Sequence, residues 1–327
     1  MVTTQRPRTL AWLRLARVSN VPTVVSAVMT GAVISHLWTG GPAVWGVGGV
    51  GGVGGLGAGG AASTFLPPSL PRVLLPLLGL IAIYIGGMIL NDALDADTDA
   101  IERPLRPIPS GHISRRSALI AAASLFVLGL FLHAMAGLLP FTCAFVIALA
   151  AAAYSLIHHR SAWAIVLLGL CRALIYPAAA SAVDATGSWR HLAVPAAFGA
   201  VIGLYTIAFS LVARGEADPS AAALRPWSSR LPWAPLLLAL LAPIPFNPSP
   251  TPWLVGALLV LAFWQFRAAS LALGSPPRTI PAVLMWIAGF CLLDTVAMVS
   301  AGHPHFAFIP LACLIATTFA HRRIIGS

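Results

Sequence analysis

Acidic side chains gather in one short stretch of this chain. Of its nine Asp and Glu residues, five lie within eleven positions, at Asp92, Asp95, Asp97, Asp99 and Glu102. On a helix, Asp92, Asp95 and Asp99 would project from one face, because they are spaced by three and four residues. Asp97 would point away. Like charges this close repel one another, so the spacing predicts a bound cation.

Mg²⁺ is the cation that such a cluster favours. It prefers hard oxygen ligands, usually one or two carboxylates, and completes its octahedron with water and phosphate oxygens. The alternative is an acidic helix end held only by Arg103 and Arg106. An acidic run at a helix C-terminus opposes the helix dipole, however, and would seldom stabilise the fold.

A loop rich in arginine and proline follows the cluster directly. Residues 102–111 read Glu-Arg-Pro-Leu-Arg-Pro-Ile-Pro-Ser-Gly. The three prolines stiffen the loop and hold Arg103 and Arg106 near the carboxylates. A guanidinium group can bind two phosphate oxygens at once. Carboxylates, a metal and arginines together would suit a diphosphate.

The elements that must position these residues are membrane helices. The chain has 327 residues, 58% apolar and only 9% charged, whereas soluble domains carry roughly 25% charged residues. Because crossing a bilayer takes ~20 apolar residues, we predict an all-α transmembrane bundle forming a single domain over residues 1–327. Ten apolar segments are candidates, at residues 18–38, 73–94, 117–137, 139–157, 162–182, 191–213, 231–246, 252–271, 279–300 and 306–320. The seventh is short and proline-rich and the tenth has His305 near its start, so nine spans are the alternative.

The basic residues indicate the orientation. All 19 are Arg and the formal net charge is +10, which could suggest nucleic acid. They fall instead in short loops on alternate sides of the apolar segments, as the cytoplasmic preference of Arg predicts. We expect loops 95–116 and 214–230 and both termini to be cytoplasmic, the Gly-rich segment 40–70 to be an outer loop, and the location to be a bacterial plasma membrane.

Two charges lie inside apolar segments, Arg172 in the fifth and Asp294 in the ninth. Each would be costly if unpaired in hydrocarbon, so both should face the bundle interior. One interpretation pairs them as a structural brace. The other has Arg172 contact the diphosphate or an acceptor anion.

These motifs resemble those of the UbiA superfamily of intramembrane prenyltransferases. The family signature N-D-x-x-D-x-x-x-D, followed by R-P-x-R-P-[IL]-x-[ST]-G, matches Asn91 to Asp99 and Arg103 to Gly111. Arg17-Val-Ser-Asn20-Val-Pro is similar to the family's opening R-x-x-[NK]-x-P. Tyr154, with His158, His159 and Arg160 after it, looks like the family's tyrosine before a basic residue. The resemblance implies Mg²⁺ held by Asn91, Asp92, Asp95 and Asp99.

The second half departs from the family pattern. Family enzymes carry a second D-x-x-x-D motif after the sixth span, whereas this chain has Glu216 and Asp218. These two would point to opposite sides of a helix unless it has already ended, which Gly215 and Pro219 allow. The altered motif looks like that of a divergent UbiA-like branch found with the ebo secondary-metabolite clusters.

The resemblance implies Mg²⁺-dependent transfer of a prenyl group from a polyprenyl diphosphate to an aromatic or similar acceptor, without nucleic acid as a partner. The alternative is a membrane carrier or scaffold that binds a prenyl diphosphate or a secondary metabolite without reacting with it. Asp92, Asp95 and Asp99 would be the catalytic residues. The expected substrate contacts are Asn91, Arg103, Arg106, Arg17, Asn20, Tyr154, Arg160, Arg172, Tyr205, Glu216, Asp218 and Asp294.

Overall fold

In the computed structural model, residues 8–38, 70–183, 189–217 and 227–323 are described. Within them, nine helices are long and apolar enough to cross a membrane, and no strand occurs. This confirms the all-α transmembrane bundle. The nine are α2 (Val21–Trp38), α3 (Leu70–Leu94), α5 (Arg115–Ala136), α6 (Leu138–Ile157), α7 (Ala164–Val183), α8 (Trp189–Ala217), α10 (Pro252–Ala272), α11 (Thr279–Ser300) and α12 (Phe308–Arg323). The predicted Gly-rich loop lies outside the described residues.

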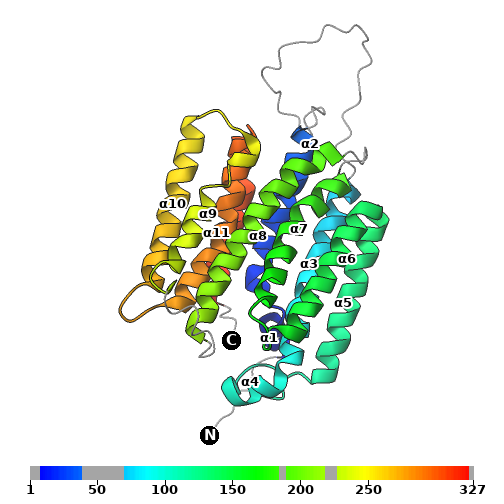
Figure 1. Cartoon of the computed structure of the whole chain (residues 1–327). Coiled ribbons are helices and arrows are strands. Elements are labelled where there is room, and N and C mark those ends of the chain that lie inside the picture. Colours follow the sequence, from blue (N-terminus) through cyan, green and yellow to red (C-terminus); the bar gives the residue numbers. More distant parts are fainter. Residues whose placement is uncertain (1–7, 39–69, 184–188, 218–226, 324–327) are drawn as a thin grey trace.

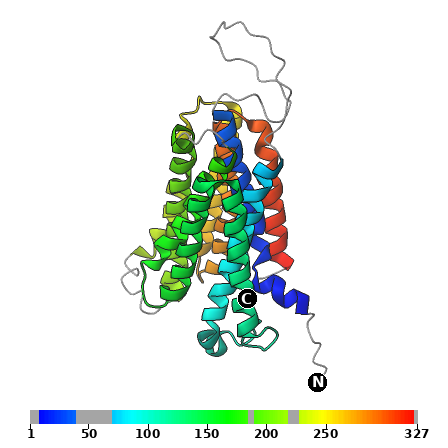
Figure 2. The same ribbon diagram turned by 90° about the vertical axis from the view of Figure 1, so that its right-hand side faces the viewer.

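The helices pack into one bundle (Figure 1), and they differ in how much of each is buried against the others. All residues from 288 to 298 of α11 are buried, so α11 lies inside the bundle. In contrast, α5 and α10 expose large apolar side chains such as Val127, Phe131 and Phe263. Lipid tails solvate such groups, so an apolar outer surface is stable here as it would not be in water. Figure 2 shows the same helices running roughly side by side.

The seventh apolar segment is a short, broken passage between two ends of the bundle. It consists of η3 (Leu231–Trp233), α9 (Ala234–Ala239) and η4 (Ile244–Phe246). Pro235 lies in the first turn of α9, and Pro243 and Pro245 follow its end, because proline starts a helix readily but cannot continue one. The short helix α1 (Arg8–Leu15) and the end of α12 lie at the same end of the bundle (Figure 1). Nine long helices alone would place them at opposite ends, so the chain also passes from one end of the bundle to the other at Leu231–Phe246.

Helices α7 and α8 approach closely through small residues. Gly199 and Gly203 of α8 face Gly169 and Ala173 of α7 so closely that an added Cβ would lie 2.2 Å and 2.9 Å, respectively, from a carbonyl oxygen of α7. This is small-residue packing with a four-residue spacing, which membrane helices use because lipid offers no hydrophobic drive for association. The close approach fixes α8 beside α7 and so helps to position the polar end of the bundle.

Candidate functional site

The acidic cluster lies where α3 ends and the short helix α4 (Ala96–Glu102) begins. The chain turns at Asp95, but backbone hydrogen bonds continue through the turn, from the Asp95 N–H to Asn91 and from the Asp99 N–H to Asp95. Helical spacing is therefore kept. Asp92, Asp95 and Asp99 are all buried on one side, at 5%, 8% and 4% exposure. Asp97 points outward and pairs with Arg115 at 3.0 Å.

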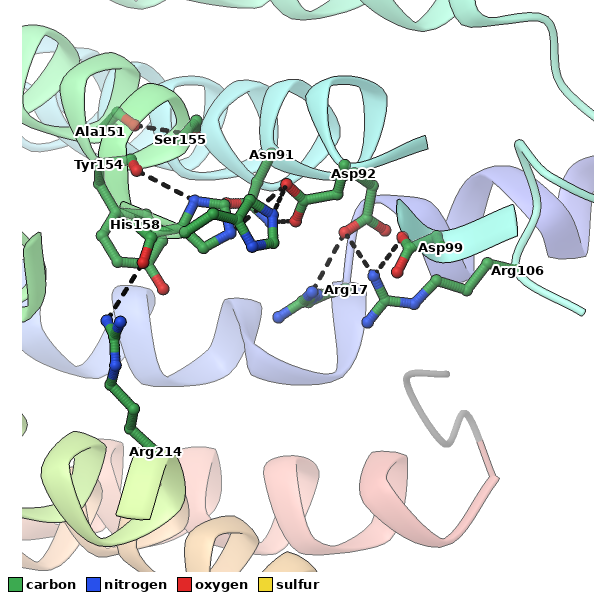
Figure 3. Close-up of polar contacts among 12 residues, drawn as sticks. Arg17, Asn91, Asp92, Asp99, Arg106, Ala151, Tyr154, Ser155, His158 and Arg214 are labelled. Atoms are coloured by element: carbon green, nitrogen blue, oxygen red, sulfur yellow. Dashed lines mark hydrogen bonds and ion pairs between the residues drawn. The ribbon is translucent and has the colours of Figure 1, made fainter. Parts of the chain in front are cut away.

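Asp92 and Asp99 share Arg106, and Asp92 also contacts Arg17 (Figure 3). Arg17 reaches Asp92 at 3.1 Å, and Arg106 forms an ion pair with Asp99 and lies 3.7 Å from Asp92. Arg17 has a left-handed backbone (φ 43°) just before η1 (Val18–Asn20). Its guanidinium group contacts Asp92 near the end of α3. Burial lowers the pKa of Arg17, but the Asp92 carboxylate together with the nearby Tyr84 and Tyr154 side chains opposes this, so the pKa is raised. Asp92 and Asp99 are thus joined by cationic groups.

Asp95 has a separate set of partners at the end of α6. It accepts a hydrogen bond from the Asn91 amide at 2.8 Å, and the Nε2 atoms of His159 and His158 lie 2.9 and 3.4 Å from its Oδ1. Burial alone would raise the pKa of Asp95, but the contacts with the two histidines lower it. The Asp95 contact raises the pKa of His158, against the opposing effect of burial. Tyr154 stacks on His158 with ring centroids 5.0 Å apart.

The donors present fit a hard divalent cation. A carboxylate only accepts hydrogen bonds, so the Asn91 amide nitrogen must face Asp95 and its oxygen lies on the other side. That oxygen is buried and has no hydrogen-bond partner among the described residues. An unpaired buried acceptor is costly, and a metal ion would satisfy it. Asn91 with Asp92, Asp95 and Asp99 thus gives an all-oxygen ligand set that suits Mg²⁺.

Not every predicted substrate contact lies against the cluster. The Asn20 amide oxygen accepts from His321 Nε2 at 2.7 Å, one turn from Arg17. Arg103 and Arg160 are exposed, and neither forms an ion pair with a described carboxylate. Glu216 belongs to α8, which continues through Gly215 to Ala217, so the helix does not end before it. Its side chain and the whole of Asp218 lie outside the described residues.

The prediction that Arg172 and Asp294 pair as a structural brace is wrong. Both Asp294 oxygens are taken by hydroxyl groups, Ser26 on Oδ2 and Tyr176 on Oδ1. Arg172 instead donates to Thr23 at 3.1 Å and lies 4.4 Å from the Phe290 ring centroid. Hydroxyls from neighbouring helices satisfy the buried acid, so it needs no ion pair.

Tyr205 is fully buried, and its hydroxyl contacts Gln265 and the Trp286 carbonyl. This places it in the core between α8, α10 and α11.

Sequence reasoning missed three residues near the cluster. The Tyr84 hydroxyl lies 3.5 Å from the Arg17 carbonyl, and Arg214 donates to the His158 and Ser161 carbonyls, at 3.1 Å each. His321 reaches Asn20 from the far end of the chain. A basic residue at the end of α8 was visible in the sequence, but its backbone targets were not, since they lie more than 50 residues away.

Comparisons with known proteins identify the relatives of this chain. The model of the UbiA prenyltransferase family matches residues 53–290. A digeranylgeranylglyceryl phosphate synthase of Metallosphaera sedula is 35% identical over 144 residues, 44% of this chain and 41% of that protein. One of Methanoregula boonei is 50% identical over 58 residues, 18% of this chain and 21% of that protein. The chain therefore matches less than half the length of these relatives.

Solved structures share the fold. A UbiA homologue from Aeropyrum pernix aligns with a TM-score of 0.62 over 86% of this chain and 97% of that chain, at 13% identity. A UbiA homologue from Archaeoglobus fulgidus, bound to GPP and Mg²⁺, aligns with a TM-score of 0.57 over 91% and 99%, at 15% identity. At these identities the likeness establishes the fold alone. Together with the matched family model and the nine membrane helices, it shows that this integral membrane protein belongs to the UbiA prenyltransferase family.

Proposed function

We propose that the chain is a Mg²⁺-dependent prenyltransferase that moves a prenyl group from a polyprenyl diphosphate to an aromatic or similar acceptor. One observation carries the proposal. Three buried carboxylates, two arginines in contact with them and an unsatisfied amide oxygen meet at one end of an apolar bundle. No other described part of the chain combines buried acids with arginines in this way.

The acidic residues would bind the metal ion, and the arginines would bind the diphosphate. Asn91, Asp92, Asp95 and Asp99 would hold Mg²⁺, which when bound supplies Lewis-acid neutralisation of the leaving diphosphate. Arg17 and Arg106 form ion pairs with the carboxylates. Their guanidinium groups would also bind oxygens of the diphosphate. Because the site is buried, these charges act with little screening by water.

The remaining predicted substrate contacts stay proposals, and they differ in how far they lie from the carboxylate cluster. Asn20 and Tyr154 lie next to the arginine and histidine groups of the site. Arg103, Arg160, Glu216 and Asp218 would act at the mouth of the bundle. Arg172, Tyr205 and Asp294 lie deeper, where the prenyl chain or acceptor would pass between helices. Burial of the prenyl chain is worth ~0.8 kcal/mol per methylene.

The test is release of pyrophosphate from a prenyl diphosphate by purified protein with Mg²⁺ and an acceptor panel that includes aromatic and glyceryl phosphate compounds. Asp92→Asn and Asp99→Asn should each lower turnover by at least ~100-fold, since each removes a carboxylate charge that would hold Mg²⁺ beside the leaving diphosphate. Asp97→Asn is the matched control, because its side chain is 86% exposed and pairs only with Arg115 among the described residues. Wild-type turnover in Asp92→Asn would refute the assignment.

A non-catalytic carrier is the second candidate, favoured by Glu216 and Asp218 standing in place of a second D-x-x-x-D motif. Inorganic pyrophosphate with Mg²⁺ should raise the melting temperature in both cases, because a ligand at 100 times its Kd adds ~2.7 kcal/mol of stability. A carrier would show this rise without releasing pyrophosphate from any prenyl diphosphate. An equal rise in the presence of a chelator would contradict metal-dependent binding in either case.

A further inference from the structure

Two adjacent histidines at the end of α6 face the carboxylate of Asp95. His158 follows the last residue of α6 and lies with His159 in a turn, their ring centroids 3.9 Å apart. One nitrogen of each ring and one oxygen of Asp95 lie within 4.8 Å of one another. This is the one such group of three His, Cys, Asp or Glu ligand atoms in the described part of the chain. None of the prenyl-transfer steps above requires imidazole.

The hydrogen bonding of His158 fixes which of its nitrogens carries the proton. Its Nδ1 lies 3.1 Å from the Tyr154 carbonyl oxygen. A carbonyl only accepts, so Nδ1 must hold a hydrogen and the neutral ring presents the lone pair of Nε2. That lone pair faces Asp95 Oδ1 at 3.4 Å. These two acceptors repel each other unless Nε2 is protonated or a metal cation lies between them.

The same arrangement is typical of histidine ligands to metals. A ligating imidazole commonly donates its other N–H to a backbone carbonyl, which fixes the tautomer and the ring orientation. Tyr154 also stacks against the His158 ring, and Arg214 holds the His158 carbonyl. His158 is therefore oriented from three sides. His159 is half exposed, at 53%, and leaves a route from solvent to Asp95.

The distances suit coordination. Metal bonds to imidazole or carboxylate are ~2.1 Å long, so neighbouring donors around one ion are ~3.0 to 3.4 Å apart. The two nitrogens lie 2.9 and 3.4 Å from Asp95 Oδ1, close to that range before any adjustment.

We propose that Asp95, His158 and His159 form a site for a divalent transition-metal ion such as Co²⁺, Ni²⁺ or Zn²⁺. Imidazole suits these ions, whereas Mg²⁺ prefers oxygen ligands alone. The inference deepens the proposed function, because it assigns a different metal preference to the Asp95 side of the same cluster. Asp95 then leaves the Mg²⁺ ligand set, and Asn91, Asp92 and Asp99 keep the oxygen ligands that Mg²⁺ favours.

Metal binding can be measured without substrate, so the test does not depend on catalysis. Tag-free protein in detergent is stripped with a chelator and titrated with Co²⁺, following visible absorption and calorimetry. His158→Ala and Asp95→Asn should each weaken Co²⁺ binding by at least ~10-fold, the lower end of what disturbing a metal ligand's surroundings costs. His159→Gln keeps a hydrogen-bond donor and should weaken binding similarly.

Two control variants test whether Co²⁺ binds other groups on the protein surface, and melting curves test whether each variant is folded. His112→Ala removes an exposed histidine that contacts Ser110, and Asp97→Asn removes an exposed carboxylate, so both should bind Co²⁺ as wild type does. Melting curves in chelator report whether each variant is folded. Absent Co²⁺ bands in the wild type, or unchanged bands in folded His158→Ala and His159→Gln, would overturn the proposal. Loss of prenyl transfer with Co²⁺ binding intact would count only against the proposed function.

Discussion

Residues on one helix face can serve different partners, and the acidic cluster does so. Asp92 and Asp99 face arginines, whereas Asp95 faces histidines and an amide. Sequence spacing predicted which carboxylates share a side, because hydrogen bonds continue through the turn at Asp95. It could not predict the partners, since Arg17 and His159 are brought in by tertiary packing from 75 and 64 residues away.

The contact between Asp95 and His158 should make stability depend on pH in metal-free protein. The pKa of Asp95 is lowered, so its contribution is present above its unfolded pKa of about 4 and is lost as pH falls through the folded value. The pKa of His158 is raised, so its contribution is full below its unfolded pKa of about 6.5 and is lost as pH rises through the folded value.

The pair should therefore stabilise most between pH about 4 and about 6.5. Melting temperatures measured in chelator across this range would show the maximum in wild type and a flatter profile in His158→Gln. Identical profiles in the two proteins would mean that this contact contributes nothing to stability.

At the scale of helices, the positions of the apolar segments could be predicted from the sequence. The side-chain contacts between the helices could not. Segments 73–94 and 279–300 agree closely with α3 and α11, since apolar length alone decides where a membrane helix can lie. The pairing of Arg172 with Asp294 failed because hydroxyls on α2 and α7 satisfy the acid, and serine, threonine and tyrosine give no charge signal in a sequence.

The contact between α7 and α8 should depend on the absence of a side chain at Gly199. A Cβ added there would collide with the Ala173 carbonyl oxygen, so the two helices would have to separate. Gly199→Ala should destabilise the protein by ~1–3 kcal/mol, the usual cost of overpacking. Gly256→Ala in α10 is the control, because no atom lies within 4 Å of its added Cβ. It should be neutral or stabilising, since alanine favours helix by ~1 kcal/mol.

Thermal unfolding in detergent gives both values. Equal melting temperatures for Gly199→Ala and wild type would show that α7 and α8 do not pack as closely as the structure indicates.

Across the whole molecule, the family and the membrane fold could be predicted because both rest on local patterns, one motif and repeated apolar runs. The choice between nine and ten spans could not be made from those patterns, since the short segment 231–246 falls below the length that marks a membrane helix. The exposed arginines that follow α4 and α6 lie at the end of the bundle that carries the acidic cluster. That distribution supports our expectation that this end is cytoplasmic.

We expect Leu231–Phe246 to cross the membrane as a tenth span, and this expectation has a direct consequence for accessibility. Ser228 precedes it and Ser249 follows it, and both are exposed. If the segment crosses the bilayer, Ser228→Cys and Ser249→Cys must lie on opposite sides. The native cysteines are buried or partly buried, so a membrane-impermeant maleimide should label them poorly. In sealed inside-out vesicles, Ser228→Cys should react and Ser249→Cys should react only after detergent is added. Labelling of both from one side would make the segment re-entrant, and would then place α1 and the end of α12 on opposite faces of the membrane.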